Sequence, residues 1–195
     1  MKKLLSGFFL KIFNRSAAPV ILQQAVSVDG PFDSALRDQV TGLYNRKHLL
    51  QRLEANMARC HRAKERMAVI LWDIDGFVDF NNRFGQEEGD KFLRKVTESI
   101  KRSIRSYDEA FRLGADEFCS ILIPADEAIA GDVTSRVANS VSKDLFQGDA
   151  EYANRQFSIS SGLVFFPGQS HLPEAILHEA RQALYRGRLT HKTTI

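Results

Sequence analysis

The feature that most constrains the fold is a run of six apolar residues, Met67–Trp72, which lies between Arg66 and Asp73. A run this short cannot cross a bilayer, but an uninterrupted apolar stretch suits a strand that is buried on both faces of a sheet. The chain of 195 residues is long enough for one globular domain with a short appendage. It can bury a core of ordinary size, so no disulfide scaffold is needed.

Helical and strand patterns surround this run. Segments in which apolar residues recur at helical spacing alternate with short segments of strand-forming residues. The predicted helices are 45–64, 89–105, 126–145 and 172–187, and the further predicted strands are 111–113, 118–123 and 156–166. The first two of these strands flank a tight turn and form a hairpin. Because no strict βαβ repeat is present, we predict an α/β fold of the α+β type, with a central mixed, mainly antiparallel sheet flanked by helices.

The net charge of +3 is concentrated at the N-terminus. Residues 1–15 carry four basic side chains and no acidic one, which leaves 23 basic and 24 acidic side chains for the rest of the chain. A nearly neutral body does not favour a nucleic-acid-binding surface, so we expect no nucleic acid among the partners. The two cysteines form no CxxC motif and the five histidines show no zinc-ligand spacing, which favours a reducing, cytoplasmic environment.

Residues 1–15 have a pattern of their own. Their apolar side chains recur on one face of a predicted helix, and the basic side chains lie mainly off that face. Such a basic amphipathic helix can lie in a membrane interface, dock on a partner protein or pack on its own domain, and it could hold the protein at the inner membrane face or a cell pole. A secretory signal fits less well, because Lys11 interrupts the apolar core. Residues 16–35 are predicted to form a linker.

Two acidic pairs stand where predicted strands end or begin. Asp73 and Asp75 follow the buried strand, and Asp116 and Glu117 lie at the tip of the hairpin. If the two strands are neighbours, these carboxylates converge at one edge of the sheet. Mg²⁺ usually takes one or two carboxylates together with substrate phosphates, so metal-assisted phosphoryl chemistry is one interpretation. Simple solvation of acids at strand ends is the other.

Two families share features with this segment. Residues 72–76 look like the DxDG motif of a phosphatase family, but Phe77 stands where that family has Thr or Val. A stronger resemblance, to GGDEF domains, spans about residues 38–193, and we place that domain at 36–193. It rests on four ordered segments. Asp38–Arg46 resembles the family's D-x-L-T-G-L-x-N-R opening, and Asp73–Asp90 resembles its D-x-D-x-F to G-D segment. Arg112–Phe118 resembles its R-x-G-G-D-E-F signature, and Ala183–Tyr185 matches its closing A-L-Y.

The resemblance implies the fold of diguanylate cyclases, which join two GTP into cyclic di-GMP across a dimer with Mg²⁺ or Mn²⁺. It implies that Asp73, Asp116 and the Ile74 carbonyl hold the metal, and that Glu117 lies beside the reacting 3′-hydroxyl, so that Asp116 and Glu117 are the catalytic carboxylates. The implied substrate-binding residues are the guanine readers Asn81 and Asp90, the signature residues Gly114 and Ala115, and the phosphate-side cations Arg188 and Lys192.

Three positions depart from the family pattern. Ala115 replaces the second glycine of the signature, so a Cβ stands where close approach or an unusual φ is expected. Val78 replaces a lysine and thereby removes a cation from the catalytic edge. Gln86 replaces a histidine. We therefore expect a degenerate signature, in which GTP binding persists and turnover is weak or absent.

Upstream of the signature, Arg105 and Asp108 stand at the place of the family's RxxD inhibitory site, with five residues between Asp108 and Gly114. The resemblance implies that cyclic di-GMP docks there, with Arg136 as a candidate for a second half-site. A helix-end ion pair is the alternative for a bare RxxD. Three hypotheses follow: an effector that binds cyclic di-GMP and GTP, which the departures favour; an active diguanylate cyclase; and an interaction module that binds no nucleotide.

Overall fold

The computed structural model describes residues 35–144 and 157–192. The predicted N-terminal helix and most of the predicted linker lie outside the described residues. In chain order, the elements are β1 (Tyr44–Asn45), α2 (Arg46–Ala63), β2 (Met67–Ile74), α3 (Phe77–Phe84), α4 (Gln86–Ser103), β3 (Glu109–Arg112), β4 (Glu117–Leu122), α5 (Glu127–Asp144), β5 (Ile159–Phe166) and α6 (Pro173–Lys192).

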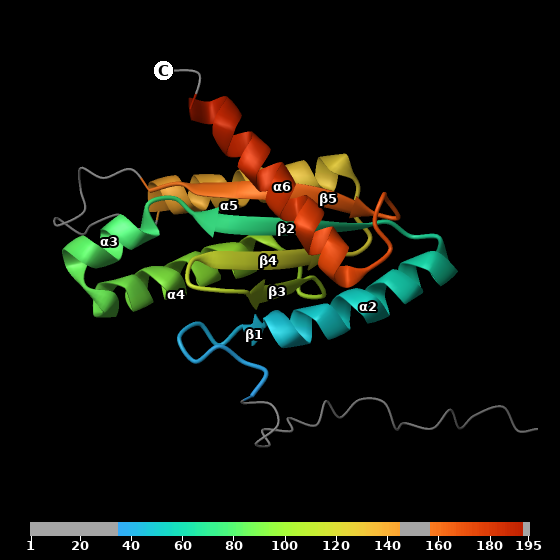
Figure 1. Ribbon diagram of the computed structural model, residues 1–195, viewed down its shortest axis with the longest axis horizontal. Helices are drawn as coiled ribbons and strands as arrows, with labels where there is room; N and C mark the ends of the chain where they lie inside the picture. The colour runs from blue at the N-terminus through green and yellow to red at the C-terminus, as the bar shows by residue number, and fades with distance from the viewer. Residues whose placement is uncertain (1–34, 145–156, 193–195) are drawn as a thin grey trace, which may run out of the picture.

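The strands form one sheet in the order β1-β3-β4-β2-β5 (Figure 1). Strands β1 and β3 are parallel, and the three other pairs are antiparallel. This arrangement confirms the predicted mixed, mainly antiparallel sheet. The apolar run at 67–72 lies in β2 between two neighbouring strands, and all six of its residues are fully buried.

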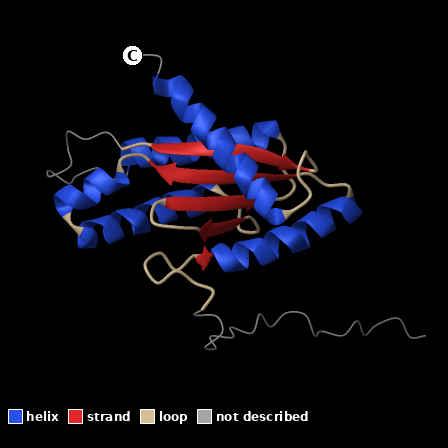
Figure 2. Cartoon of the chain, viewed as in Figure 1, coloured by secondary structure: helices blue, strands red, loops and turns tan. Residues whose placement is uncertain are grey.

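Helices cover both faces of the sheet (Figure 2). Leu71 and Val69 of β2 point toward α2 and α6, and they share a core with Leu49, Leu53 and Leu184. The alternate side chains of β2 point to the other face, where Ile70 and Trp72 share a core with residues of α3, α4 and α5. The period of two along a strand therefore supplies both cores from a single segment. None of the helices in the described ranges combines the length and apolar character that a membrane span requires.

The chain differs from the sequence prediction in several places, and the two-residue strand β1, for example, was not predicted. Helix α3 is not predicted by the apolar pattern, because it is only eight residues long. Gly76 and Gly85 bound it with φ angles of 72° and 86°, a region that glycine adopts without a steric penalty. Strand β2 continues to Ile74, two residues beyond the apolar run, because its backbone remains paired with β5 as far as Ile159.

Candidate active site

The end of β2 and the start of β4 bring the predicted carboxylates together. The two strands are antiparallel neighbours, and Asp73 is the register partner of Glu117. Just beyond this pair, the Ile74 amide donates a hydrogen bond to the Asp116 carbonyl over 3.2 Å. The predicted metal-holding groups, the side chains of Asp73 and Asp116 and the Ile74 carbonyl, therefore come from adjacent positions at one edge of the sheet.

Helix α6 places two arginines over this edge. Arg188 donates from one terminal nitrogen to Asp73 Oδ1 over 2.5 Å and to Asp75 Oδ1 over 2.9 Å. Arg181 forms a bidentate pair with Glu117 over 2.8 and 2.7 Å. The two arginines are seven residues apart, which is about two helical turns, so they extend from the same side of α6. Arg188 was expected on the phosphate side; the pairing of Arg181 with Glu117 was not predicted.

Close packing of α6 on the sheet depends on Gly162 of β5. A Cβ built at this glycine would lie 2.0 Å from the Ala180 carbonyl oxygen and 2.6 Å from the Leu184 backbone nitrogen. Any larger residue would push the helix away from the strand. The absence of a side chain at Gly162 thus lets the arginines of α6 reach the carboxylates of β2 and β4.

The electrostatics of this edge favour an added cation. Burial raises the pKa of Asp73; Arg188 opposes this rise through its hydrogen bond and charge, and the neighbouring Asp116 and Asp75 reinforce it. In the described ranges 35–144 and 157–192, no three His, Cys, Asp or Glu side chains gather into a metal site of their own. Two carboxylates and a carbonyl nevertheless fit Mg²⁺ or Mn²⁺, whose other ligands are then water and substrate phosphates.

A cavity of about 900 Å³ opens beside these groups, and Asp73, Ile74, Asp116 and Arg188 line it. This volume falls within the range of nucleotide and cofactor sites. Val78, at the position where a lysine was expected, also lines the cavity and is 65% exposed. Its side chain offers the cavity no charge.

A second cavity, of about 320 Å³, lies between α3, α4 and the signature turn; Asn81, Asp90, Arg112 and Ala115 line it. The Asn81 Oδ1 atom is buried and has no hydrogen-bond partner in the part of the chain that the structure describes. It fits against Gly89, where an added Cβ would lie 1.9 Å from it. An unpartnered buried acceptor is unfavourable, and the N–H groups of a guanine edge are donors that could satisfy it.

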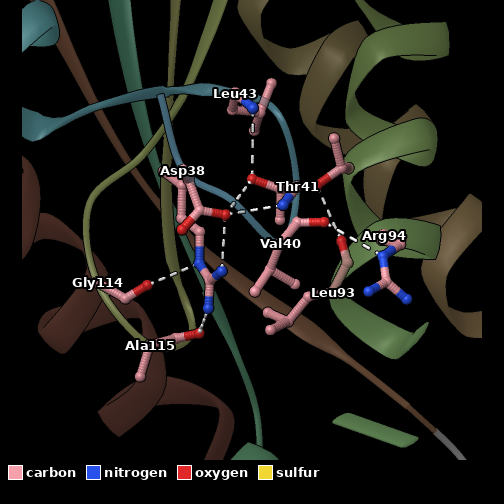
Figure 3. A network of polar contacts seen from close by, with 10 residues as sticks. Asp38, Val40, Thr41, Leu43, Leu93, Arg94, Gly114 and Ala115 are labelled. Atoms are coloured by element: carbon pink, nitrogen blue, oxygen red, sulfur yellow. Dashed lines mark hydrogen bonds and ion pairs between the residues drawn. The ribbon is translucent and has the colours of Figure 1, made fainter. Parts of the chain in front are cut away.

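Arg112 joins the signature turn to Asp38; Figure 3 shows Asp38 beside the turn residues Gly114 and Ala115. Its guanidinium donates to the Gly114 and Ala115 carbonyls over 2.9 and 2.8 Å and to Asp38 Oδ1 over 2.8 Å. Burial alone would raise the pKa of Asp38, but the hydrogen bonds from Thr41 and Arg112 lower it below its ordinary value. The D-x-x-T segment at 38–41, singled out only as a motif, therefore supports the signature turn.

Ala115 itself is exposed and accepts from Arg112 through its carbonyl. Among the described residues, Lys64 is the one non-glycine residue with a positive φ, so Ala115 adopts a conformation that any L-residue accepts. Backbone strain, one of the two consequences expected from this substitution, is absent. The bulk of one methyl group at the cavity wall remains.

Arg105 and Asp108 line a third cavity, of about 380 Å³, together with Lys101 and Tyr44. The Asp108 carboxylate accepts from the backbone nitrogens of Arg105 and Ile123. Arg136 is not among the residues that line this cavity; it donates to the Ser103 carbonyl at the end of α4. Lys192 ends α6, and its side chain lies outside the described part of the structure.

The sequence assigned no role to Arg181, Ser158 and Ser160, and it singled out Asp75 and Arg112 only within motifs; all five contact the groups above. Asp75 was visible as the second acid of a D-x-D motif. Arg112 was visible as the first residue of the signature. Arg181, Ser158 and Ser160 have no local signal, because their partners are distant in sequence; Arg181 and Glu117 are 64 residues apart.

Comparisons with known proteins agree with this geometry. The family model described as "Diguanylate cyclase, GGDEF domain" matches residues 35–194. The diguanylate cyclase DgcP of Pseudomonas aeruginosa is 34% identical over 155 residues, which are 79% of this chain and 22% of that protein. The diguanylate cyclase DosC of Escherichia coli is 29% identical over 91% of this chain and 38% of its own length.

Among solved structures, the GGDEF domain of DgcB from Caulobacter crescentus, in complex with c-di-GMP, superposes with a TM-score of 0.73. It is 26% identical, and the match covers 80% of this chain and 89% of that one. The chain spans well under half the length of the curated relatives described above.

Proposed function

This chain belongs to the GGDEF family of diguanylate cyclase domains, which act in cyclic di-GMP signalling, and we propose that it is itself a diguanylate cyclase. In the proposed reaction, the 3′-oxygen of each GTP forms a bond to the α-phosphorus of the other. The bond from that phosphorus to the departing diphosphate breaks, and each 3′-hydroxyl loses its proton. Two GTP thus give one cyclic di-GMP and two diphosphates.

In the proposed reaction, different residues of this chain bind the base, the phosphates and the metal. Asn81 and Asp90 hold the guanine edge, and Arg188 contacts the phosphates at the 900 Å³ cavity. Asp73, Asp116 and the Ile74 carbonyl would hold Mg²⁺ or Mn²⁺. When bound, such a cation polarises the phosphoryl group and lowers the pKa of the attacking hydroxyl. One domain supplies one such site, so the reaction requires two copies of the chain face to face.

One observation carries this proposal: Asp73 and Asp116 lie at neighbouring strand ends and line one cavity, while a second cavity is lined by Asn81, whose buried Oδ1 has no hydrogen-bond partner among the described residues. Two further findings favour activity over the degenerate effector expected from the signature. Ala115 is not strained, and the proteins named DgcP and DosC above are diguanylate cyclases.

The test is incubation with GTP and Mg²⁺ or Mn²⁺, followed by chromatography of the products. We expect cyclic di-GMP and diphosphate from GTP, no corresponding product from ATP, and loss of product in Asp116→Asn. Equal product from the wild-type chain and from Asp116→Asn would contradict the proposal.

A second candidate function is that of an effector which binds cyclic di-GMP at Arg105 and Asp108. The observation in its favour is the third cavity, where the Arg105 guanidinium makes no hydrogen bond to any described residue. Isothermal titration with cyclic di-GMP tests it. Arg105→Ala should weaken binding at least tenfold, whereas Arg102→Ala, an exposed arginine on α4, is the matched control. An unchanged affinity in Arg105→Ala would exclude this role.

A further inference from the structure

Asp75 is held from three directions. Its Oδ2 accepts from the Ser158 hydroxyl over 2.7 Å, and its Oδ1 accepts from the Ser160 hydroxyl over 2.7 Å and from Arg188 over 2.9 Å. Its backbone nitrogen also donates to the Ser158 carbonyl over 3.1 Å. Both carboxylate oxygens are therefore engaged, and the residue is fixed against β5.

Asp73 differs sharply from Asp75, although both face the same cavity. Within the described residues, its carboxylate accepts a hydrogen bond only from Arg188, through Oδ1. Its side chain is less exposed than that of Asp75, 23% against 33%. Asp73 accepts one such hydrogen bond and Asp75 three, so Asp73 retains more acceptor capacity toward the cavity. Of the two, Asp73 is suited to take up a cation and Asp75 to act as an anchor.

A single nitrogen of Arg188 is shared between these two carboxylates. A guanidinium on Asp73 opposes a divalent cation at the same carboxylate, because the two positive charges repel and compete for the same oxygens. Any contact that holds Arg188 elsewhere lessens this competition. Asp75 offers the same nitrogen a second acceptor, held in place by two serines, so Arg188 keeps a carboxylate partner when a cation takes up Asp73.

We propose that Asp75 is a positioning residue: fixed by Ser158 and Ser160, it retains Arg188 when a divalent cation takes up the Asp73 carboxylate. This inference rests on the proposed cyclase site, since it assumes that a cation binds there. It assigns no metal contact to Asp75 itself. The serines contribute through hydrogen bonds alone, and replacing them changes no charge.

The neutrality of the serines allows a clean test with Mn²⁺ alone, by titration followed by electron paramagnetic resonance, with no nucleotide present. We expect Ser158→Ala/Ser160→Ala to bind Mn²⁺ five- to tenfold more weakly than the wild-type chain. Arg188→Met should bind it more tightly than wild type. Adding the two serine substitutions to Arg188→Met should change the Mn²⁺ affinity less than twofold, because the guanidinium that Asp75 holds is then absent. Ser135→Ala, an exposed serine on α5, is the control.

Three outcomes would overturn the inference: an unchanged Mn²⁺ affinity in the serine variant, an equal effect of the serine substitutions with and without Arg188, or no Mn²⁺ binding by the wild-type chain. An equal effect would mean that Asp75 acts on the cation directly. Thermal unfolding in EDTA checks that each variant is folded, and the single serine variants replace the double one if it is not. Because no GTP is present, the Mn²⁺ affinities do not depend on whether the chain makes cyclic di-GMP. Failure of the cyclase proposal would instead appear as absence of product in the assay with GTP.

Discussion

Ala115 and Val78 are unequal departures from the family pattern, because their surroundings differ. Ala115 lies in the signature turn with an ordinary backbone conformation, and its carbonyl is held by Arg112. Val78 is largely exposed and lines the cavity shared by Asp73 and Asp116. A methyl group in a turn that tolerates it is a small change, whereas a cation missing beside phosphates removes electrostatic stabilisation of the transition state.

We therefore predict that Val78→Lys raises the rate of GTP turnover about tenfold or more, as a restored charge at a phosphate site would. Ala115→Gly should change turnover less than about threefold, and it should lower stability by about 0.5–1 kcal/mol through the added freedom of the unfolded chain. Steady-state kinetics and chemical denaturation measure both effects. A larger rate gain from Ala115→Gly than from Val78→Lys would refute this ranking.

Asp38 ties the start of the domain to the signature turn, so its charge should matter for stability. Its lowered pKa means that the folded state binds the proton less readily than the unfolded state does. At neutral pH, Asp38→Asn should destabilise the chain by about 1–2 kcal/mol. The stability difference should be full above the ordinary pKa of 3.8 and should vanish as the pH falls through the lower folded-state pKa. Denaturation curves at pH 7 and at successively lower pH values check this, and a difference that grows on acidification would contradict it.

At the scale of elements, the contact between α3 and α4 shapes the pocket that we propose for guanine. Gly89→Ala adds a good helix former to α4, but its Cβ would displace the end of the Asn81 side chain. We expect GTP binding to weaken about tenfold while stability changes by no more than about 1 kcal/mol. Gly131→Ala in α5, where an added Cβ meets nothing within 4 Å, is the control and should leave binding unchanged. Unaltered GTP affinity in Gly89→Ala would mean that Asn81 does not hold guanine.

The docking of α6 is the second element-scale feature. At Gly162, a Cβ would meet backbone atoms of α6, which cannot rotate away as a side chain can. Gly162→Ala should therefore lower the free energy of unfolding by about 2–3 kcal/mol and also reduce GTP turnover, because Arg181 and Arg188 move with the helix. Thermal unfolding measures the first effect, and Gly131→Ala again serves as the control. A free energy of unfolding in Gly162→Ala equal to that of the wild-type chain would show that α6 can shift without loss of stability.

Some elements were predictable from the sequence and others were not, for physical reasons. The apolar run identified β2, and the turn at 114–116 identified the β3–β4 hairpin, because burial and turn chemistry are local. Helix α3 escaped prediction, since it is short and bounded by glycines. The pairs Arg188–Asp73 and Arg181–Glu117 depend on how α6 packs, and residues 115 and 64 positions apart carry no spacing signal.

At the scale of the whole molecule, the proposed reaction requires two copies of the chain for one turnover, because each domain would contribute one nucleotide site. We predict that the rate of cyclic di-GMP formation per protomer rises with protein concentration and levels off once the dimer is complete. Product formation over a hundredfold range of concentration, compared with sedimentation of the same samples, measures this. A rate per protomer that is constant throughout, in a chain that sediments as a monomer, would contradict it.

We propose a working diguanylate cyclase site, formed by the carboxylates of β2 and β4 with the pocket around Asn81. Its most direct test is chromatography after incubation of the chain with GTP and Mg²⁺ or Mn²⁺ at a concentration that favours the dimer. We predict cyclic di-GMP from the wild-type chain, more from Val78→Lys and none from Asp116→Asn. Absence of product from both the wild-type chain and Val78→Lys would contradict the proposal.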